Sequence, residues 1–393
     1  MSRYKLFIVF ACSFLAGIAA ASFYFDGNVL KAGFITGVFL FLFFRIIWKD
    51  EFFGLCFIVF VLGFVFGIFR FFISEDPGTN SWLADGGSFL FDFLRSLNSL
   101  FSKQLATIFN EPYGGFMAGL LLGNRSEISY DLMQNFNTVG LTHIIAISGY
   151  NITLVISIVC GLFSFLSRKK RVIFSIVFVV CFVILVGSSA SVVRAAVMGI
   201  IGLVAVYFGR VYVASVSLIA SAFFMNLWNP RLLVYDVGFE LSVLATAGLV
   251  YVSAFVSENF VNKYFKFLPA FAGIRESFSM TLSAQIFVLP LILVYFGRLS
   301  LVSPIANLIV LPFIPWIMLF GFLSGFANFF SGWLGNFFGF TAYILMKLVI
   351  SIIGGFAILP FAAIKIEWFG FWMAATCYFL IWRLLCRWGI KLF

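Results

Sequence analysis

Apolar segments of membrane length follow one another along almost the entire chain, and they constrain its fold more than any other feature. A helix needs about twenty residues to cross a bilayer. Because the lipid core offers no water to unpaired backbone groups, such segments are expected to be helical. About twelve of them can be placed, near residues 6–25, 29–48, 52–73, 142–166, 172–188, 190–208, 211–228, 235–256, 277–297, 302–325, 336–359 and 367–387.

The composition supports the same fold class. Of the 393 residues, 63% are hydrophobic and 10% are charged, whereas a soluble domain has roughly a quarter of its residues charged. The chain is therefore predicted to be an all-α, polytopic membrane helix bundle. The six cysteines include no C-x-x-C pair, which argues against a disulfide framework or a zinc site. We expect neither a metal nor a cofactor.

The basic residues predict the orientation of the bundle. If every segment crosses the membrane, one acidic loop, Glu75–Asp76, falls on one side. The basic groups fall on the other: Arg3/Lys5, Arg45/Lys49, Arg168–Arg171, Arg210, Lys263/Lys266 and Arg383/Arg387/Lys391. Since positively charged loops stay in the cytoplasm, both termini are expected there.

Three regions can be distinguished along the chain. Residues 1–73 hold the first membrane helices, and residues 141–393 hold the main bundle. Residues 74–140 are the least hydrophobic stretch and show amphipathic helical spacing, so we expect interfacial helices on the extracytoplasmic face. Prolines cluster near 298–315, at Pro304, Pro312 and Pro315. They predict a broken or re-entrant element, which is tolerated at membrane depth only against protein or a water-filled cavity.

Polar residues are concentrated in residues 140–153. This stretch contains His143, the single histidine of the chain, followed by Ser148, Gly149 and Asn151. Such groups cost free energy in a membrane segment unless they line a cavity or find partners, and Gly149 weakens the helix there. His143 and Ser148 lie about 500° apart around a helix, so direct activation of the serine as a nucleophile is not expected.

Three charged residues occur in later apolar segments. Arg194 either lies inside the bundle, where burial costs at least about 2.5–3.5 kcal/mol, or extends to the membrane interface. Asp236 and Glu240 share one helix face. They either form a buried charge cluster with Arg194 or line a pore or gate. Gln285 and Asn307 are either ordinary interhelical contacts or part of a site at the broken element.

Taken together, these stretches resemble the transmembrane competence domain of the ComEC family, the bacterial inner-membrane channel for DNA uptake. The matching pieces occur in the family's order across residues 119–312. They are Gly119-Leu-Leu-Leu-Gly123, Gly140-Leu-Thr-His-Ile-Ile-Ala-Ile-Ser-Gly149, Ser188-Ser-Ala-Ser-Val-Val-Arg-Ala-Ala196, Asp236-Val-Gly-Phe-Glu-Leu-Ser242, Gln285 with Leu289-Pro290, and Ser303-Pro-Ile-Ala-Asn-Leu-Ile-Val-Leu-Pro312.

The chain departs from the family pattern in several places. Tyr150-Asn151 replaces the usual Leu-His, and Glu240 replaces the usual glutamine. Full-length members also carry an OB-like domain and a metallo-β-lactamase-like domain. The segment between Ile73 and Phe116 is too short for the former, and one histidine cannot build the metal site of the latter. We therefore expect a channel-only member that is not an enzyme, with any nuclease on a separate protein.

The resemblance implies passage of single-stranded DNA through the bundle, with His143, Ser148, Asn151, Arg194, Gln285 and Asn307 along the path. Arg125 and Lys103 would meet phosphates at the outer face. A cytoplasmic ATP-driven motor would be needed because the chain has no P-loop, and an extracytoplasmic DNA receptor is a further expected partner. The alternative is an ion-coupled permease for a small solute, with Asp236 and Glu240 carrying protons or cations.

Overall fold

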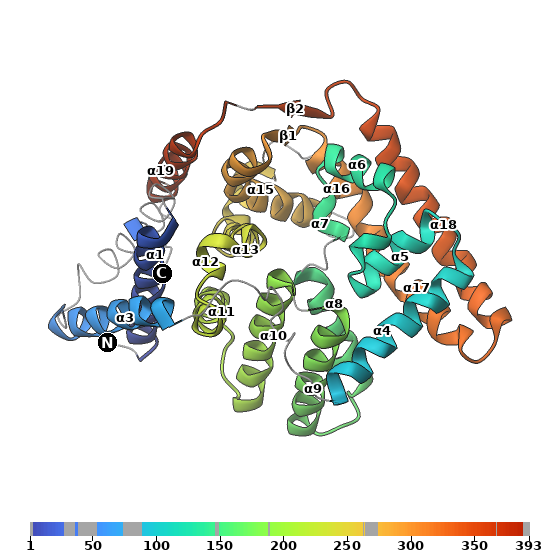
Figure 1. Ribbon diagram of the computed structural model, residues 1–393, viewed down its shortest axis with the longest axis horizontal. Helices are drawn as coiled ribbons and strands as arrows, with labels where there is room; N and C mark the ends of the chain where they lie inside the picture. Colours follow the sequence, from blue (N-terminus) through green and yellow to red (C-terminus); the bar gives the residue numbers. More distant parts are fainter. Residues whose placement is uncertain are drawn as a thin grey trace.

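The computed structural model describes residues 3–26, 36–37, 53–73, 89–145, 149–187, 189–261, 263, 274–366 and 368–387. These residues are almost entirely helical (Figure 1). In the first half of the chain the elements are α1 (Arg3–Asp26), α3 (Phe53–Ile73), α4 (Phe89–Ile108), α5 (Tyr113–Leu122), the 3-10 turn η1 (Arg125–Glu127), α6 (Tyr130–Val139), α7 (Thr142–Ile145), α8 (Gly149–Leu162) and α9 (Arg168–Val186).

The second half continues in the same style, with two short strands. Its elements are α10 (Ala190–Phe208), α11 (Ala214–Trp228), α12 (Leu232–Tyr235), α13 (Val237–Val256), the π-helical turn η2 (Ser257–Val261), α15 (Ile274–Phe296), β1 (Arg298–Ser300), α16 (Ser303–Val310), the 3-10 turn η4 (Leu311–Phe313), α17 (Ile314–Asn328), α18 (Gly332–Ala357), β2 (Ala363–Lys365) and α19 (Phe371–Arg387).

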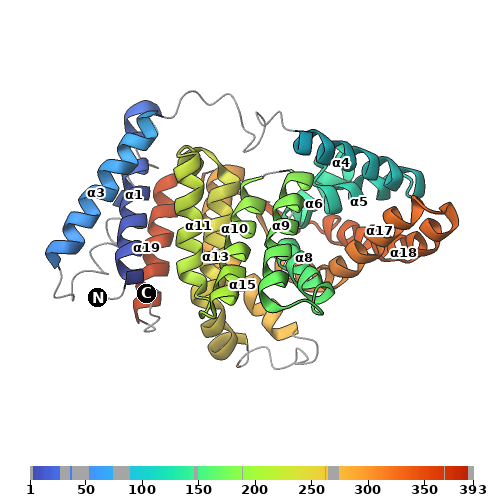
Figure 2. The ribbon, with the colours of Figure 1, turned by 90° about the horizontal axis from the view of Figure 1, so that it is seen from below.

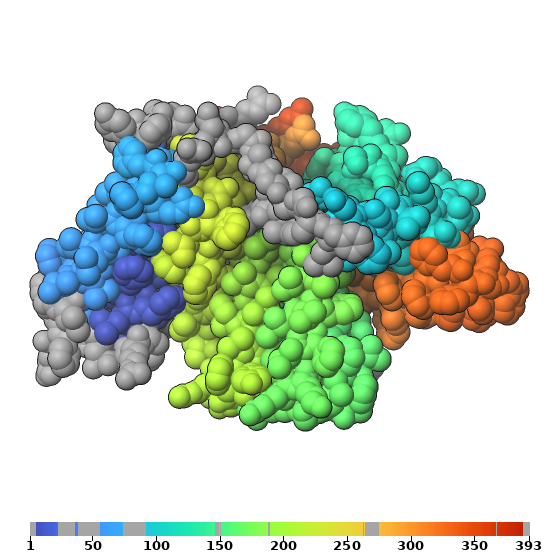
Figure 3. Space-filling view, turned by 60° about the horizontal axis from the view of Figure 1, so that its bottom comes forward, coloured from blue at the N-terminus to red at the C-terminus, as the bar shows by residue number. Residues whose placement is uncertain are grey.

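The helices form one elongated bundle. Figure 2 shows α1, α19, α11, α13 and α10 running side by side in one direction, while α4, α17 and α18 run across that direction at the far end. The space-filling view in Figure 3 shows α8 to α10 as a broad face between the α1–α3 end and the α17–α18 end. The predicted all-α membrane bundle is therefore confirmed.

The expected number of about twelve crossings is not confirmed. Among the described residues, seven helical segments are long and apolar enough to span a membrane. The helices at Asn151–Leu162 and Ala214–Trp228 are shorter, and α9 begins with four consecutive basic residues. The predicted segment 29–48 falls almost wholly outside the described residues. Apolar length in the sequence was therefore a poor guide to helix length in the centre of the bundle.

Glycines allow α1 and α3 to pack backbone to backbone. A Cβ atom added to Gly17 would overlap the Phe64 carbonyl, and one added to Gly67 would overlap the Phe14 carbonyl. Helices in membranes associate through such close van der Waals contacts, because lipid gives little hydrophobic driving force between them. The α1–α3 pair also packs against α11 and α12 through Phe14, Ile18 and Phe223.

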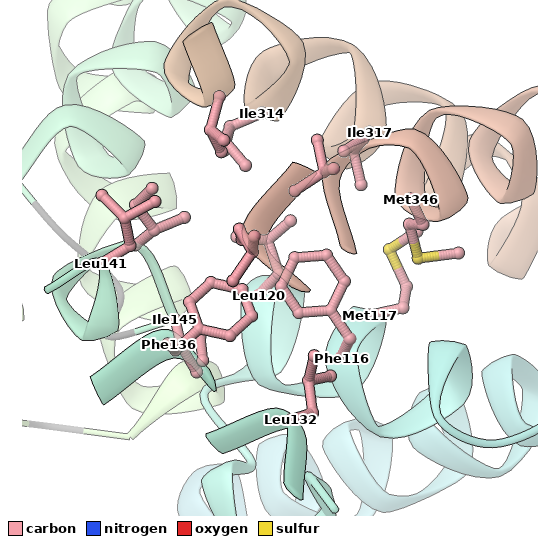
Figure 4. Packing of buried hydrophobic residues seen from close by; sticks show 14 of the residues in the cluster. Phe116, Met117, Leu120, Leu132, Phe136, Leu141, Ile145, Ile314, Ile317 and Met346 are labelled. Atoms are coloured by element: carbon pink, nitrogen blue, oxygen red, sulfur yellow. The ribbon is translucent and has the colours of Figure 1, made fainter. Parts of the chain in front are cut away.

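The largest apolar core joins the two regions that the sequence kept separate. It contains side chains from α4, α5, α6 and α7 together with side chains from α16, α17 and α18. Figure 4 shows Phe116, Leu120 and Phe136 packed against Ile314 and Ile317. Nine of the ten residues of α5 are buried. The described part of 74–140 is thus integrated into the bundle, and α5 does not lie on its surface.

A break separates α15 from the next helices. After Phe296 the chain passes through Gly297, whose φ of 59° suits glycine, and then forms β1. Pro304 lies in the first turn of α16, and Pro312 lies in the 3-10 turn between α16 and α17. The structure therefore interrupts the helix inside the predicted 298–315 element, with prolines at positions where a missing backbone N–H is tolerated.

A two-stranded ribbon closes this break. β1 pairs with β2 in antiparallel register, with Leu299 opposite Ile364. Figure 1 shows that β2 lies on the connection that carries the chain from α18 at one end of the bundle to α19 near the other. There the Tyr378 hydroxyl donates a 2.8 Å hydrogen bond to the Phe287 carbonyl of α15. The ribbon was not expected from the sequence, because three-residue strands leave almost no pattern.

Replacing a packing glycine should destabilise the protein although alanine favours helix. Gly67→Ala places a Cβ atom against the Phe14 carbonyl, and such overpacking costs about 1–3 kcal/mol. Gly355→Ala is the matched control, because nothing lies within 4 Å of its Cβ position and alanine gains about 1 kcal/mol in a helix. Thermal unfolding in detergent should show a lower Tm for Gly67→Ala and no loss for Gly355→Ala. Equal Tm values would contradict the close contact.

Candidate functional site

The turn between α6 and α7 is held directly against the break between α15 and α16. Gly140 ends α6 with a φ of 76°, and a Cβ atom there would lie 2.9 Å from the Ser300 Cβ and 3.1 Å from the Ser303 Cβ. The Ser300 hydroxyl donates to the Val139 carbonyl at 2.8 Å, and the Ser303 hydroxyl donates to the Gly140 carbonyl at 3.4 Å. Glycine is needed here for its backbone conformation and for its lack of a side chain.

Two amide side chains extend this contact along α15 and α16. The Gln285 Nε2 donates to the Ser303 Oγ at 3.0 Å, and the Asn307 Nδ2 donates to the Thr281 Oγ1 at 2.8 Å. Thr281 and Gln285 are four residues apart, so they share one face of α15. These pairs satisfy polar groups that would be costly to leave unpaired in a membrane interior. The same contacts fix α16 relative to α15.

His143 lies beside these pairs. Its ring interacts with the Asn307 side chain and with the Gly140 backbone. α7 packs against α5 and α6 inside the bundle (Figure 1), and its residues Ile144 and Ile145 are buried, yet the His143 side chain is exposed. The imidazole therefore lies against Asn307 of α16 and the Gly140 turn. We call Gly140, His143, Gln285, Ser303 and Asn307 the elbow cluster.

Arg194 forms a second polar cluster. Its side chain is only 6% exposed. Its Nε donates to the Ser242 Oγ at 2.7 Å, and its Nη1 donates to the Thr246 Oγ1 and contacts the Met198 sulfur at 3.3 Å. A Cβ atom added to Gly149, the first residue of α8, would lie 3.5 Å from the Arg194 Nη2. We call Arg194, Ser242 and Thr246 the arginine cluster.

The two carboxylates do not pair with this guanidinium. Asp236 begins α13 as its N-cap, where its Oδ1 accepts from the Phe239 backbone N–H at 2.8 Å. Glu240 is buried and accepts a hydrogen bond from the Tyr295 hydroxyl at 2.9 Å. The hydrogen bonds of these side chains therefore do not show the cluster with Arg194, the first of the two alternatives, and the pore or gate role stays a prediction.

The geometry of α13 explains this arrangement. Ser242 and Thr246 lie one turn apart on the helix face toward α10, and the Ser191 hydroxyl donates to the Gly238 carbonyl on that same side, at 3.5 Å. Glu240 is two residues from Ser242, which rotates its side chain by about 200° to the opposite face. It consequently faces α15. Sequence spacing identified the pair of carboxylates, but it could not identify which neighbouring helix would meet them.

The remaining predicted residues lie apart from these clusters. Asn151 is buried near the start of α8. Arg125 lies on η1 and Lys103 on α4, and both are exposed. Ser148 lies outside the described residues. Within the described ranges, no three His, Cys, Asp or Glu side chains gather as a metal ion would require.

Several residues of the site were missed by sequence reasoning. The hydroxyls of Ser242, Thr246, Thr281, Ser300 and Ser303 supply most of the hydrogen bonds in the two clusters. One signal could have identified some of them. Ser242 and Thr246 repeat at the helical spacing of four, as do Thr281 and Gln285, and polar repeats of this kind in an apolar helix indicate a face that meets protein.

The comparisons with known proteins identify the family. Residues 120–391 match the family model "Competence protein". The chain belongs to this competence protein family. It is also 25% identical, over 216 residues, to ComE operon protein 3 of Bacillus subtilis (strain 168). The match covers 54% of this chain but 26% of that relative, so the chain spans about a quarter of the relative's length. No solved structure matches.

This membership confirms the resemblance that the sequence motifs predicted. The family match includes both polar clusters, since it begins before Gly140 and ends after the last helix that contacts them. Together with the apolar helices, it makes the chain a membrane protein of the competence family. The three-dimensional structure adds that two residues of these motifs lie beside glycines: His143 beside Gly140, and Arg194 beside Gly149.

Substitution of Gly140 tests the contact between the turn and the break. Gly140→Ala introduces both backbone strain of about 1–2 kcal/mol and contact with Ser300 and Ser303. Gly209→Ala is the matched control, because Gly209 also ends a helix, with a φ of 66°, but meets only the flexible end of Arg168. We expect a larger drop in Tm for Gly140→Ala than for Gly209→Ala. Equal drops would show that backbone strain alone accounts for the effect.

Proposed function

We propose that this protein is a channel in the bacterial inner membrane that passes single-stranded DNA into the cytoplasm during natural transformation. The observation that carries the proposal is the family match over residues 120–391, which covers both polar clusters. In this proposal the chain crosses the membrane several times with both termini in the cytoplasm. An extracytoplasmic receptor delivers the DNA, and a cytoplasmic ATP-driven motor pulls it inward.

The chemistry of the elbow cluster supports such a path. A strand that moves through a membrane needs groups that form hydrogen bonds without selecting a sequence. His143 supplies an imidazole beside Asn307, and Gln285 and Asn307 supply amides on α15 and α16. Gln285 and Asn307 link α15 to α16, the two helices that flank the break. In the proposal, Asn151 continues the path near the start of α8, Ser148 lines it as a further polar residue, and Arg125 meets DNA at the outer face.

The charges also favour an anionic cargo. Arg194 is buried with neutral hydroxyls as its partners, so its positive charge is not cancelled by Asp236 or Glu240. A permease that carries cations or protons would instead rely on the two carboxylates. Asp236 caps a helix, and Glu240 is bonded to Tyr295, which gives both a structural role in the proposed channel.

Loss of the protein should block DNA entry without blocking DNA binding at the cell surface. A deletion strain is given fluorescently labelled DNA, and the fraction that resists external nuclease is measured. We expect surface-bound label to remain and protected label to fall to background, with recovery when the full chain is restored. Internalisation at the wild-type level in the deletion strain would contradict the proposed function.

Two single-charge substitutions test which buried charge serves the proposed channel. Arg194→Gln removes charge-assisted hydrogen bonds worth about 1.5–3 kcal/mol each, so we expect DNA entry to fall by about tenfold or more. Glu240→Gln retains a partner for Tyr295, and we expect less than about a fivefold change, as for one ordinary hydrogen bond. Membrane levels are matched by immunoblot. Wild-type DNA entry in Arg194→Gln at matched membrane levels would contradict the proposed role of this charge, and a larger loss for Glu240→Gln than for Arg194→Gln would assign the carboxylate, not the guanidinium, to the path.

A further inference from the structure

Arg194 has an unused donor that faces the beginning of a helix. Its Nε and Nη1 are occupied by Ser242, Thr246 and the Met198 sulfur. Its Nη2 donates to no residue in the described part of the chain, although only 6% of the residue's surface is exposed. This nitrogen lies 3.5 Å from the position that a Gly149 Cβ would occupy. The free donor is therefore directed at the first turn of α8.

Burial of a guanidinium costs several kcal/mol unless an opposite charge is present, and among the described residues the hydrogen-bond partners of Arg194 are neutral. The hydroxyls of Ser242 and Thr246 supply hydrogen bonds but no charge. The first turn of α8 adds the positive end of a helix dipole, and α8 is 14 residues long. Two independent sources of positive potential consequently meet at Gly149.

We propose that Arg194 Nη2 and the first turn of α8 form a binding subsite for one phosphodiester group of the transported strand. This inference rests on the proposed function and specifies where the strand's charge is met inside the bundle. Anions bind favourably at helix N-termini, and arginine is suited to phosphate because its N–H groups match the oxygen geometry. Because Gly149 has no side chain, no Cβ atom of α8 stands at the position 3.5 Å from Nη2.

The hydrogen bonds from Arg194 to Ser242 and Thr246 also limit how tightly this subsite can bind a phosphate. An arginine commonly grips phosphate with two parallel N–H groups, but here Nε and Nη1 already have partners on α13. One nitrogen therefore remains for the phosphate, which gives a single charge-assisted contact. Such a contact lowers the barrier for an anion to enter the bundle and still releases it. Ser242 and Thr246 act as positioning residues that hold the guanidinium in place.

The salt dependence of DNA binding tests this subsite. Affinity of the purified full-length protein in lipid nanodiscs is measured for a homopolymeric dT oligonucleotide at several salt concentrations. Each phosphate contact on a single strand contributes about 0.7 to the slope of log K against log salt. We expect Arg194→Gln to reduce the magnitude of that slope by about 0.7. A methylphosphonate oligonucleotide of the same length, which lacks backbone charge, should bind equally to the wild type and to this variant.

Two further variants keep the subsite testable if Arg194→Gln does not fold. Gly149→Ala places a methyl group in ordinary contact with Nη2 and with the Ala195 Cβ, at 3.5 Å each, so the fold should tolerate it while the subsite is filled. Gly161→Ala is the control on the same helix, since nothing lies within 4 Å of its Cβ position. We expect Gly149→Ala to weaken dT binding and reduce the salt slope. Gly161→Ala should change neither.

The outcomes separate the subsite from the function. If deletion blocks DNA entry but Arg194→Gln and Gly149→Ala retain the wild-type salt slope, the proposed channel function is supported and the proposed subsite is wrong. A loss of affinity with no change of slope would assign Arg194 a structural role and would also overturn the subsite. If deletion leaves entry unchanged and the wild type does not bind dT, both proposals fail.

Discussion

A break in a helix frees backbone groups that need new hydrogen-bond partners, and in a membrane protein these come from protein because lipid provides none. The interruption between α15 and α16 meets this requirement in two ways. The β1–β2 ribbon pairs the extended backbone on one side, and Ser300 and Ser303 bond to the carbonyls of Val139 and Gly140 on the other. The contact joins α6 and α7 to α16, and these three helices contribute side chains to the largest apolar core, together with α4, α5, α17 and α18.

The arginine cluster solves a related problem in a different way. A buried guanidinium is usually compensated by a carboxylate, and α13 carries Glu240 only two residues from Ser242. The helix nevertheless turns hydroxyls toward Arg194 and the carboxylate toward Tyr295. This arrangement leaves a positive charge in the bundle that a structural ion pair would have cancelled. In the proposed channel, that remaining charge is what makes the interior favourable for a phosphate backbone.

Much of the architecture could be predicted from residue patterns. Apolar length identified a helical membrane bundle, and the prolines near 298–315 marked the interruption that the structure has at Gly297 and β1. The number of crossings could not be predicted, because central helices such as α8 and α11 are short. Nor could the burial of α5, whose ten residues follow Pro112 and pack against α17 and α18. Helix ends depend on caps and on packing partners that are distant in the sequence.

The sequence by itself determined the class of the protein, its family and the polar residues that a membrane segment would not retain without a purpose. His143, Arg194, Gln285 and Asn307 were all identifiable because charged or amide groups are rare in apolar helices. Only the tertiary structure decided which of them meet. His143 approaches Asn307, Gln285 meets Ser303, and Arg194 lies beside Gly149 with hydroxyl partners. Periodicity places a side chain on a helix face, but the rotation and neighbours of each helix are set by packing of the whole bundle.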